Sequence, residues 1–545
     1  MADHQRLLAE FTAPDGEFAL EHREVRGVPM RVHRTGPQTL RDVLLASREY
    51  GEAEFTVYER QRRTFTEHFH LAAGLAHALL GEFGLRRGDR VAIAMRNYPE
   101  WAPIFFAAQA AGLIAVPLNA WWSGAELRYG LADSGAKVLF ADDERVAALG
   151  GDLGGLQVVQ VRGTAPEGVR SWEDVLAGLD PFAEPPEVAV DPDDDATIMY
   201  TSGTTGRPKG AVGTHRNHCT NLWNIVLGRR IAAVLSGAEP AERPGVLLTF
   251  PLFHIAGLSA LCFAALAGAK AVTMYRWNAA TAAELVRAER LTSIAGVPTV
   301  LRDLAESEPG ELSTLDGVSM GGAPIPPDLV GRVRRSLSAE LAPANGYGLT
   351  ETTSAVVTNS GEEYVANPDS VGRLVPGAEL RVVDPATGED VPEGEVGELW
   401  FRGPQIVRGY WNNPAATEEA FGGGWFRTGD LGRVRDGLVH VVDRMKDVVL
   451  RGGENVYCAE VEAALFEHPA VADAAVLGVP DEALGERVVA VVQLHGPASE
   501  QDLREHVAAR LAAFKVPDRI HPRAEVPRNA TGKVRKKDLR CELAP

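Results

Sequence analysis

The sequence predicts an α/β fold in at least two domains. Three observations support this: the length of the chain, an alternation of apolar strands with helical segments, and a change of pattern after about residue 370. The chain has 545 residues, of which 45% are hydrophobic and 24% charged, as in a globular protein. A chain of this length is too long for one hydrophobic core, so a second domain is expected.

The first part of the chain alternates between helix and strand signals. Thr64 and Glu67 form a capping box ahead of a leucine-rich helical stripe over 71–79, and Gly88 then turns the chain into an apolar segment. Apolar strands of this region are predicted at 91–95, 114–118, 137–141 and 196–200. This order is typical of a mostly parallel sheet covered by helices.

The later part of the chain has a different pattern. Segments 379–383 and 396–401 flank a Pro-Ala-Thr-Gly turn and read as antiparallel strands. The last hundred or so residues contain strands at 473–477 and 487–494 and an amphipathic helix at 503–514. We therefore divide the chain into a domain over 1–445 and a smaller one over 446–545.

Charge and cysteine content exclude several classes of protein. With 55 Lys plus Arg against 74 Asp plus Glu, the net charge of −19 argues against a nucleic-acid binder, which needs a basic face. The four cysteines have no zinc-site or disulfide spacing, which indicates a reducing, cytoplasmic setting. The first residues lack the features of a signal peptide, and the apolar run 255–269 is too short to span a bilayer, so it is predicted to be a buried helix.

A glycine- and threonine-rich motif follows a predicted strand. After the acidic, proline-rich connector 180–195 and the strand 196–200 comes Tyr-Thr-Ser-Gly-Thr-Thr-Gly-Arg-Pro-Lys-Gly over 200–210. A bound phosphate needs close approach of the backbone and several hydrogen-bond donors. Glycines permit the close approach, and the hydroxyl groups supply donors. The spacing is not that of a Walker A loop. On this motif alone, a flexible surface loop is the alternative.

This motif closely resembles the phosphate-binding signature of the adenylate-forming superfamily, which includes acyl-CoA synthetases, nonribosomal adenylation domains and firefly luciferase. Six further segments resemble family motifs and occur in the family order: Pro251–Gly257, Asn345–Thr352, Trp425–Asp430, Asp443–Asp447, Arg451–Val456 and Pro527–Lys533. A single motif of this kind is weak evidence for the family, but seven motifs in the family order are highly specific evidence. The resemblance extends from about residue 50 to the C-terminus.

The resemblance implies a fold and a reaction. The expected fold is a large N-terminal domain of two doubly wound sheets and a small β-barrel, followed by a small mobile α+β C-terminal domain. The expected enzyme is an acyl-CoA synthetase that uses ATP, Mg²⁺ and coenzyme A. It would join a small-molecule carboxylic acid to AMP with release of pyrophosphate, and then transfer the acyl group to CoA.

The resemblance also assigns the nucleotide site. Tyr347 would stack on adenine, Asp430 would bind the ribose hydroxyls, and Arg444 would reach the ribose or the α-phosphate. Glu351 would bind Mg²⁺, which prefers carboxylate and phosphate oxygens. The remaining members of the nucleotide site are Thr201, Ser202, Gly203, Thr204, Thr205, Gly206, Lys209, Gly322, Ala323, Pro324, Gly346, Gly348, Thr350 and Lys533. A surface acid at Glu351 and a structural ion pair between Asp430 and Arg444 are the alternatives.

Lys533 is the predicted catalytic residue. A cation between the acid and the α-phosphate stabilises the charge that develops when a carboxylate attacks phosphorus. The alternative is a solvated member of the charged run 533–537. Thr204 and Glu351 complete the predicted catalytic set together with His254, which the resemblance places beside the acid and the path of the thiol. A buried structural role is the alternative for this histidine.

The acid pocket and the CoA site are also implied by the resemblance. The predicted acid pocket consists of Trp223, His254, Ile255, Gly321, Gly322 and Gly346. These residues lack an anchoring charge and indicate a hydrophobic acid, whether fatty, alicyclic or aromatic. Lys446 is the predicted hinge, and Gly452 and Gly453 form the loop of the thioester stage.

Other functions remain open from the sequence. A stand-alone adenylating enzyme would load a carrier protein in trans, because the chain contains no evident carrier. A luciferase-like oxidation shares the first step. A non-catalytic scaffold with the same fold would not need Thr204, Glu351, Asp430 and Lys533 together. A homodimer is also an open expectation.

Overall fold

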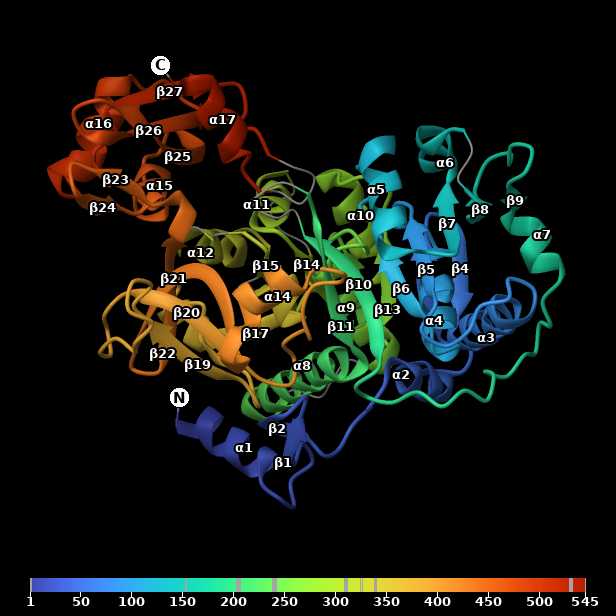
Figure 1. Ribbon diagram of the computed structural model, residues 1–545. Coiled ribbons are helices and arrows are strands. Elements are labelled where there is room, and N and C mark those ends of the chain that lie inside the picture. The colour runs from blue at the N-terminus through green and yellow to red at the C-terminus, as the bar shows by residue number, and fades with distance from the viewer. Residues whose placement is uncertain are drawn as a thin grey trace.

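The computed structural model of the chain has the predicted α/β class (Figure 1). It describes residues 2–151, 154–201, 207–237, 243–307, 312–323, 325, 327–337, 341–528 and 533–544. An N-terminal body extends to the strand that ends at Arg444, and a smaller C-terminal unit begins at Val449. Among the helices of the described residues, none combines the length and the apolar character of a membrane-spanning segment.

One sheet of seven strands carries the first alternating segment. Its order is β11 (Lys209–Thr214), β10 (Asp195–Thr201), β6 (Ile114–Pro117), β5 (Arg90–Ala94), β7 (Val138–Asp142), β8 (Gln157–Val161) and β9 (Arg170–Ser171). The pairs are parallel except for β10 with β11 at one edge. The four strands predicted at 91–95, 114–118, 137–141 and 196–200 are confirmed to within about two residues.

A second sheet has nine strands. Its order is β18 (Arg373–Leu374), β17 (Ser354–Ser360), β16 (Ala342–Leu349), β15 (Gly317–Gly321), β14 (Ser293–Gly296), β12 (Gly245–Leu248), β13 (Lys270–Thr273), β3 (Glu54–Tyr58) and β4 (Gln61–Thr64). The strands from β16 to β3 run parallel, so their carboxyl ends meet at one edge. Ligands of doubly wound sheets bind beyond such an edge.

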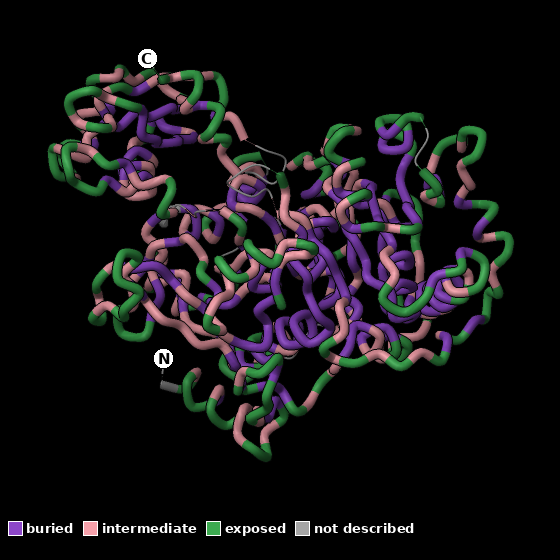
Figure 2. Tube along the Cα trace, viewed as in Figure 1, coloured by how far each residue is buried: buried purple, intermediate pink, exposed green. Residues whose placement is uncertain are grey.

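The main core lies between the two sheets. It joins residues of β5 and β12 with the helices α2 (Leu40–Ser47), α3 (Phe65–Gly81), α4 (Trp101–Ala110) and α9 (Ile255–Leu266). The continuous buried trace of this region is visible in Figure 2. The apolar run predicted as a buried helix at 255–269 is α9. The region preceding the family resemblance forms α1 (Ala2–Thr12), β1 (Leu20–Val25) and β2 (Val28–His33).

The remaining helices of the body complete the layers around the two large sheets, and some of them, such as the helix that carries Leu222, also contribute to the main core. They are α5 (Gly124–Ser134), α6 (Asp143–Leu149), α7 (Trp172–Ala177), α8 (His215–Ser236), α10 (Ala279–Glu289), α11 (Pro298–Ser307), α12 (Pro327–Ser336), α13 (Gly361–Ala366) and α14 (Pro414–Phe421). Of these, α11 and α12 lie on the side of the body that faces the C-terminal unit (Figure 1).

A four-stranded antiparallel sheet ends the body. It consists of β19 (Glu379–Val383), β20 (Gly397–Arg402), β21 (Phe426–Arg435) and β22 (Leu438–Arg444), which confirms the hairpin predicted around the Pro-Ala-Thr-Gly turn. A bridge between Gly372 and Val439 joins this sheet to the segment just before β18. The 3₁₀ turn Met445–Asp447 then leads out of the body.

The C-terminal unit is an α+β layer with its own core. Its strands are β24 (Glu454–Val456), β23 (Val449–Arg451), β26 (Gly485–Leu494), β25 (Val471–Asp481) and β27 (Arg519–Arg523), and its helices are α15 (Cys458–Phe466), α16 (Glu500–Ala508) and α17 (Lys536–Leu543). Its buried residues form clusters separate from those of the body. A separate core is what an independently moving unit requires.

One predicted helix is shorter than expected. The helix predicted at 503–514 ends at Ala508, and a separate 3₁₀ turn occupies Ala513–Lys515. The amides of Arg510 and Leu511 both bond to the carbonyl of Val507, which closes the helix. Leu511 and Phe514 still pack against the core of the unit, so the apolar pattern continues beyond the helix itself.

A matched pair of leucines on α2 tests the main core. Leu44 is fully buried in it, whereas its neighbour Leu45 is 40% exposed. Leu44→Ala should lower the free energy of unfolding of the body by about 3 kcal/mol, because it removes buried methyl groups and leaves a cavity. Leu45→Ala should change it by less than about 1 kcal/mol. Urea unfolding followed by tryptophan fluorescence measures both, and equal shifts would contradict this packing.

Candidate active site

The predicted phosphate loop connects two paired strands at an edge of the first sheet. Thr201 is the last residue of β10, Lys209 is the first residue of β11, and the two lie opposite each other in the antiparallel register. Ser202, Gly203, Thr204, Thr205 and Gly206 lie outside the described residues. The described ends of the loop therefore fix where it starts and finishes.

The acid of the predicted metal site follows β16. Glu351 lies in the 3₁₀ turn Thr350–Thr352 and is only 8% exposed. Thr353 and Ser354 follow it with positive φ angles of 50° and 79°, which side chains rarely adopt. The hydroxyl of Thr352 bonds to the amide of Leu349 and to the carbonyl of Ser354, and so holds this turn. Such strain persists where the surroundings fix it, and it is frequent at binding sites.

Glycine is required in the strand before this turn. A Cβ on Gly348 would lie 1.8 Å from the carbonyl oxygen of Ser354, so no side chain fits there. Gly346 and Gly348 leave Tyr347 as the side chain that this stretch of β16 presents, and its phenol donates to Oδ2 of Asp430 at 2.7 Å. Thr350 begins the 3₁₀ turn beside it.

The register of β21 and β22 pairs Asp430 with Arg444. Nε of Arg444 lies 3.1 Å from Oδ1 of Asp430, whose side chain is 5% exposed. Asp430 therefore contacts both Tyr347 and Arg444. The predicted ribose acid, adenine-stacking ring and arginine thus form one group, although they come from different strands.

Lys533 approaches this group from the C-terminal unit. Burial and the nearby guanidinium of Arg444 lower the pKa of Lys533, while the carboxylates of Glu351 and Asp430 raise it. Both carboxylates thus lie close enough to stabilise the charged ammonium group. In this orientation the predicted catalytic lysine lies in the site and not on a solvated face.

Tyr410 is a site residue that the sequence analysis missed. Its hydroxyl donates to Oε1 of Glu351 at 2.8 Å, and Nζ of Lys209 lies 5.0 Å from the centre of its ring. One tyrosine thus connects the end of the phosphate loop with the predicted metal ligand. The residues around Tyr410 contain no pattern that indicates this role, because its partners come from distant parts of the chain.

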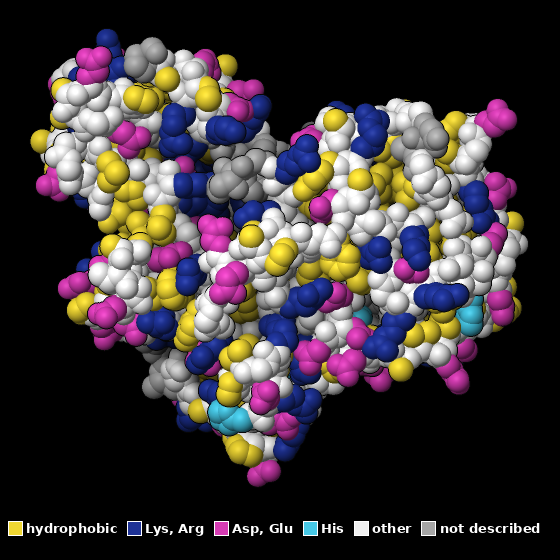
Figure 3. All heavy atoms as spheres, viewed as in Figure 1, with side chains coloured by type: hydrophobic (Ala, Val, Ile, Leu, Met, Phe, Trp, Pro, Cys, Tyr) yellow, Lys and Arg dark blue, Asp and Glu magenta, His cyan; other side chains and the backbone are white. Residues whose placement is uncertain are grey.

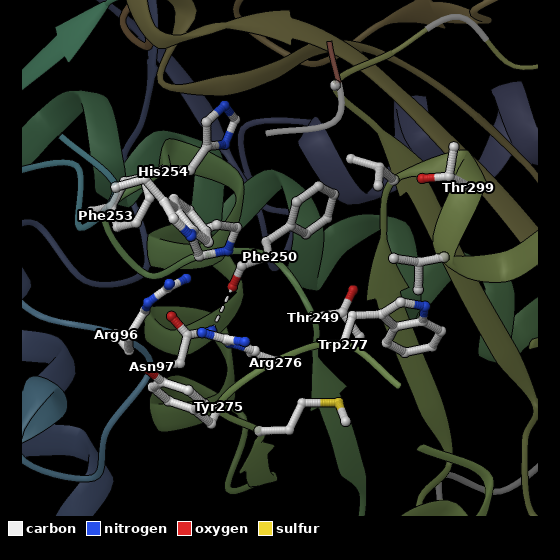
Figure 4. A pocket seen from close by; sticks show the side chains of 16 residues that line it. Arg96, Asn97, Thr249, Phe250, Phe253, His254, Tyr275, Arg276, Trp277 and Thr299 are labelled. Carbon is white, nitrogen blue, oxygen red and sulfur yellow. Dashed lines mark hydrogen bonds between the residues drawn. The ribbon is translucent and has the colours of Figure 1, made fainter. Parts of the chain in front are cut away.

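A cavity of about 560 Å³ adjoins the site (Figure 4). His254 and Gly322 line it, as predicted for the acid pocket, whereas Trp223, Ile255, Gly321 and Gly346 are not among its lining residues. Trp223 packs on Phe18 instead, with ring centres 4.8 Å apart. Ile255 belongs to the main core, and Gly321 pairs with Gly346 in adjacent strands next to Gly322. Ala323 follows Gly322, and Pro324 lies outside the described residues.

The cavity has an apolar side and a cationic side. Phe250 and Phe253 line it near His254, while Arg96 and Arg276 lie together with Tyr275 on the other side (Figure 4). Val297 also lines the cavity. The guanidinium of Arg96 lies 4.5 Å from the ring centre of Trp121 and 5.4 Å from that of Tyr275. Among the described residues, no carboxylate forms an ion pair with Arg96 or Arg276.

His254 is a neutral imidazole at physiological pH. Burial lowers its pKa to about 4, and Lys533 acts in the same direction. His254 is also the N-cap residue of α9, where Nδ1 accepts the amide of Ala256 at 3.3 Å. This bond gives the ring a structural role and fixes its orientation toward the cavity.

The predicted hinge and glycine loop lie at the junction and beyond it. Lys446 is in the 3₁₀ turn that follows β22, where burial lowers its pKa. Gly452 and Gly453 form the two-residue turn between β23 and β24, with φ angles of 60° and 89°. Both angles are positive, as a type I′ hairpin requires. Lys and Arg side chains gather where the C-terminal unit meets the body (Figure 3), although the whole chain is acidic.

Known proteins resemble this chain over most of its length. The family described as AMP-binding enzyme matches residues 45–411, and the AMP-binding enzyme C-terminal domain matches residues 460–533. A feruloyl-CoA synthase of an Amycolatopsis species is 37% identical over 485 residues, which cover 88% of this chain and 93% of that protein. The long-chain-fatty-acid–CoA ligase FadD13 of Mycobacterium tuberculosis is 32% identical over 498 residues, with the same two coverages.

Solved structures show the same architecture. The o-succinylbenzoate CoA synthetase MenE of Bacillus subtilis, in complex with its acyl-adenylate intermediate, is 31% identical with a TM-score of 0.77 and covers 91% of this chain and 97% of its own. The same enzyme with ATP and a magnesium ion also gives a TM-score of 0.77 at 31% identity, covering 92% of this chain and 98% of its own.

Glu351 can be tested by its effect on nucleotide binding. Glu351→Gln should weaken the binding of ATP in the presence of Mg²⁺ by about tenfold, because an amide lacks the charge of the carboxylate. Isothermal titration calorimetry measures the affinity. Glu362→Gln is the matched control, since that side chain is 83% exposed. Unchanged affinity together with a large loss of stability in Glu351→Gln would favour a structural role.

Proposed function

Because the chain belongs to the AMP-binding enzyme family, we propose that Lys533, Glu351, Asp430 and Arg444 are the residues with which it activates a carboxylic acid. The protein is an AMP-forming acid–thiol ligase that uses ATP, magnesium and CoA. The observation that carries the residue assignment is the convergence of Lys533 on the two carboxylates and the arginine.

The reaction has two steps. A carboxylate oxygen of the acid attacks the α-phosphorus of ATP, and the bond to the departing pyrophosphate breaks. The sulfur of CoA then attacks the acyl carbon, AMP leaves with the bonding electrons, and the thiol loses its proton. Lys533 would stabilise the negative charge that gathers around the α-phosphorus in the first step. Glu351 and Asp430 favour its charged form in spite of burial.

Glu351 fits the magnesium ion that the family uses. Magnesium is held by one or two carboxylates together with substrate phosphates, and not by an all-protein cage. Among the described residues, no group of three or more His, Cys, Asp or Glu side chains could hold a metal, and Glu351 is a single carboxylate with one oxygen bound by Tyr410. When bound, the ion would neutralise phosphate charge.

We assign the two sides of the cavity to different substrates. The side near His254, Phe250 and Phe253 is apolar and would take the acid, which we propose to be hydrophobic and aromatic or aliphatic. The side with Arg96, Arg276 and exposed Trp121 would take the phosphorylated nucleotide of CoA, because guanidinium groups bind phosphate and aromatic rings stack on bases.

We also propose positions for the domain boundary and for the hinge. We place the boundary at Lys446, between the last strand of the body and the first strand of the C-terminal unit. Lys533 and the Gly452–Gly453 turn belong to one unit, and Lys533 is the residue at the site in this orientation. Rotation about Lys446 would present the glycine turn for the second step.

Acceptor, assembly and location complete the proposal. CoA is the acceptor that the relatives share, and the thiol of a carrier protein in trans is the alternative. A homodimer is the alternative to a single chain. We place the protein in the cytoplasm, which agrees with its four free cysteines.

An acid panel tests the activity itself. Octanoate, benzoate, ferulate and o-succinylbenzoate are each incubated with ATP and magnesium, with and without CoA, and AMP and thioester are quantified. At least one acid should give AMP and thioester in equal amounts only when CoA is present. Thioester formation on an added carrier protein but not on CoA would establish the alternative acceptor.

Lys533→Ala should abolish the first step and spare the second. With the best acid of the panel, ATP–pyrophosphate exchange should fall by at least about a thousandfold, because the transition state loses its buried cation. Thioester formation from supplied acyl-AMP should remain close to that of the unaltered protein. Lys537→Ala is the control, since Lys537 is exposed on the same charged run. Exchange at an unaltered rate in Lys533→Ala would refute the assignment.

Arg96→Gln tests the cationic side of the cavity. It should raise the KM for CoA by about tenfold, because a charge-assisted hydrogen bond to phosphate is lost. The KM for pantetheine, which lacks the phosphates, and the KM for the acid should change little. An increase in the KM for the acid with that for CoA unchanged would instead assign this side of the cavity to the acid.

A further inference from the structure

A hydrogen bond outside the hinge segment joins the body to the C-terminal unit. Nη1 of Arg302 on α11 donates to the carbonyl oxygen of Ala472 on β25 at 2.6 Å. The Arg302 side chain is 22% exposed, so the contact is partly shielded from water. A short bond from a charged donor in such surroundings is stronger than a bond between neutral groups.

A bulge in β25 makes this acceptor available. Val471 pairs with Leu494 and Asp473 pairs with Gln493, so Ala472 is an extra residue without a partner on β26. The extra residue of a bulge is left out of the strand ladder. Its carbonyl oxygen can therefore accept a hydrogen bond from outside the sheet.

Asp473, the residue after Ala472, is connected by hydrogen bonds to the segment that contains Lys533. The carboxylate of Asp473 is 6% exposed and accepts two bonds from the guanidinium of Arg528, at 3.0 Å and 2.7 Å. Arg528 in turn forms a β-bridge with Val534, the neighbour of Lys533. A short covalent and hydrogen-bonded path thus leads from Ala472 to the segment that carries the lysine.

The donor is presented by a rigid helix beside the cavity. Leu301 and Leu304 of α11 are fully buried, Thr299 lines the cavity, and Asp303 accepts the indole NH of Trp277 at 3.2 Å. Both partners of the Arg302–Ala472 bond are therefore held in place. The bond can form only in an orientation of the C-terminal unit close to the one seen here.

We propose that Arg302 is a positioning residue for the first step of the reaction: its bond to Ala472 docks the C-terminal unit in the orientation that places Lys533 beside Glu351 and Asp430. The proposal rests on the proposed function of Lys533. Because the acceptor is a neutral backbone oxygen, the bond can break without leaving an unpaired carboxylate, so the C-terminal unit can leave this orientation for the second step.

The test separates the two half-reactions in the full-length protein. With the best acid of the panel, Arg302→Ala should lower the rate of ATP–pyrophosphate exchange by about tenfold, as expected for the loss of one hydrogen bond from a charged donor. Thioester formation from supplied acyl-AMP should change by less than about twofold, because that step does not require this docking. Arg302→Lys, which keeps the charge but reaches differently, should restore exchange only in part.

Two controls make the outcomes decisive. Arg287→Ala removes an exposed arginine from the neighbouring helix α10 and should leave both half-reactions unchanged. Thermal unfolding should give the same Tm for Arg302→Ala and the unaltered protein. An equal loss in both half-reactions, or a full exchange rate in Arg302→Ala while Lys533→Ala is inactive, would overturn the positioning role. If Lys533→Ala also retained full exchange, the proposed function itself would fail.

Discussion

A lysine must enter a partly buried site as a cation, and this electrostatic constraint explains much of the surrounding structure. Burial and Arg444 both lower the pKa of Lys533, whereas the carboxylates of Glu351 and Asp430 raise it and so favour the charged form. Each carboxylate is fixed by a tyrosine, Tyr410 for the first and Tyr347 for the second. Both carboxylates are thus oriented by fixed partners before any substrate arrives.

The same constraint accounts for the neutral histidine beside the cavity. A protonated His254 would add a second cation next to Lys533, and burial together with that lysine keeps its pKa near 4. Its ring is then free to act as a hydrogen-bonding cap and as a wall of the cavity. The apolar side of the cavity can then lie close to Lys533, because the other cations that line the cavity, Arg96 and Arg276, are on its opposite side.

Sequence reasoning located the segments that carry a local signal. The strands at 379–383 and 473–477 follow from the pattern of apolar residues, which depends on neighbouring residues only. Glu351 and Asp430 were assigned by resemblance, and the structure brings both close to Lys533. The predicted end of the helix at 503–514 is wrong because Leu511 and Phe514, which follow the helix, are apolar and pack against the core of the unit.

What sequence reasoning missed depends on long-range geometry. Tyr410 contacts Glu351 and Lys209, and Arg302 meets Ala472, without any pattern around either residue. The family resemblance implies that Trp223 lies in the acid pocket, but its side chain packs on Phe18. The surroundings of a side chain on a helix such as α8 depend on which elements pack against that side of the helix. This packing cannot be deduced from a single sequence.

The bulge at Ala472 has a consequence for variation in this chain. Since the acceptor is a backbone oxygen, its position is determined by the number of residues between Val471 and Asp473 and not by the side chain at 472. Substitutions there would leave the contact with Arg302 intact, whereas deletion of a single residue would restore regular pairing and withdraw the oxygen into the ladder. The contact between the two units thus depends on the number of residues in β25. A comparison of residue identities alone would not detect this dependence.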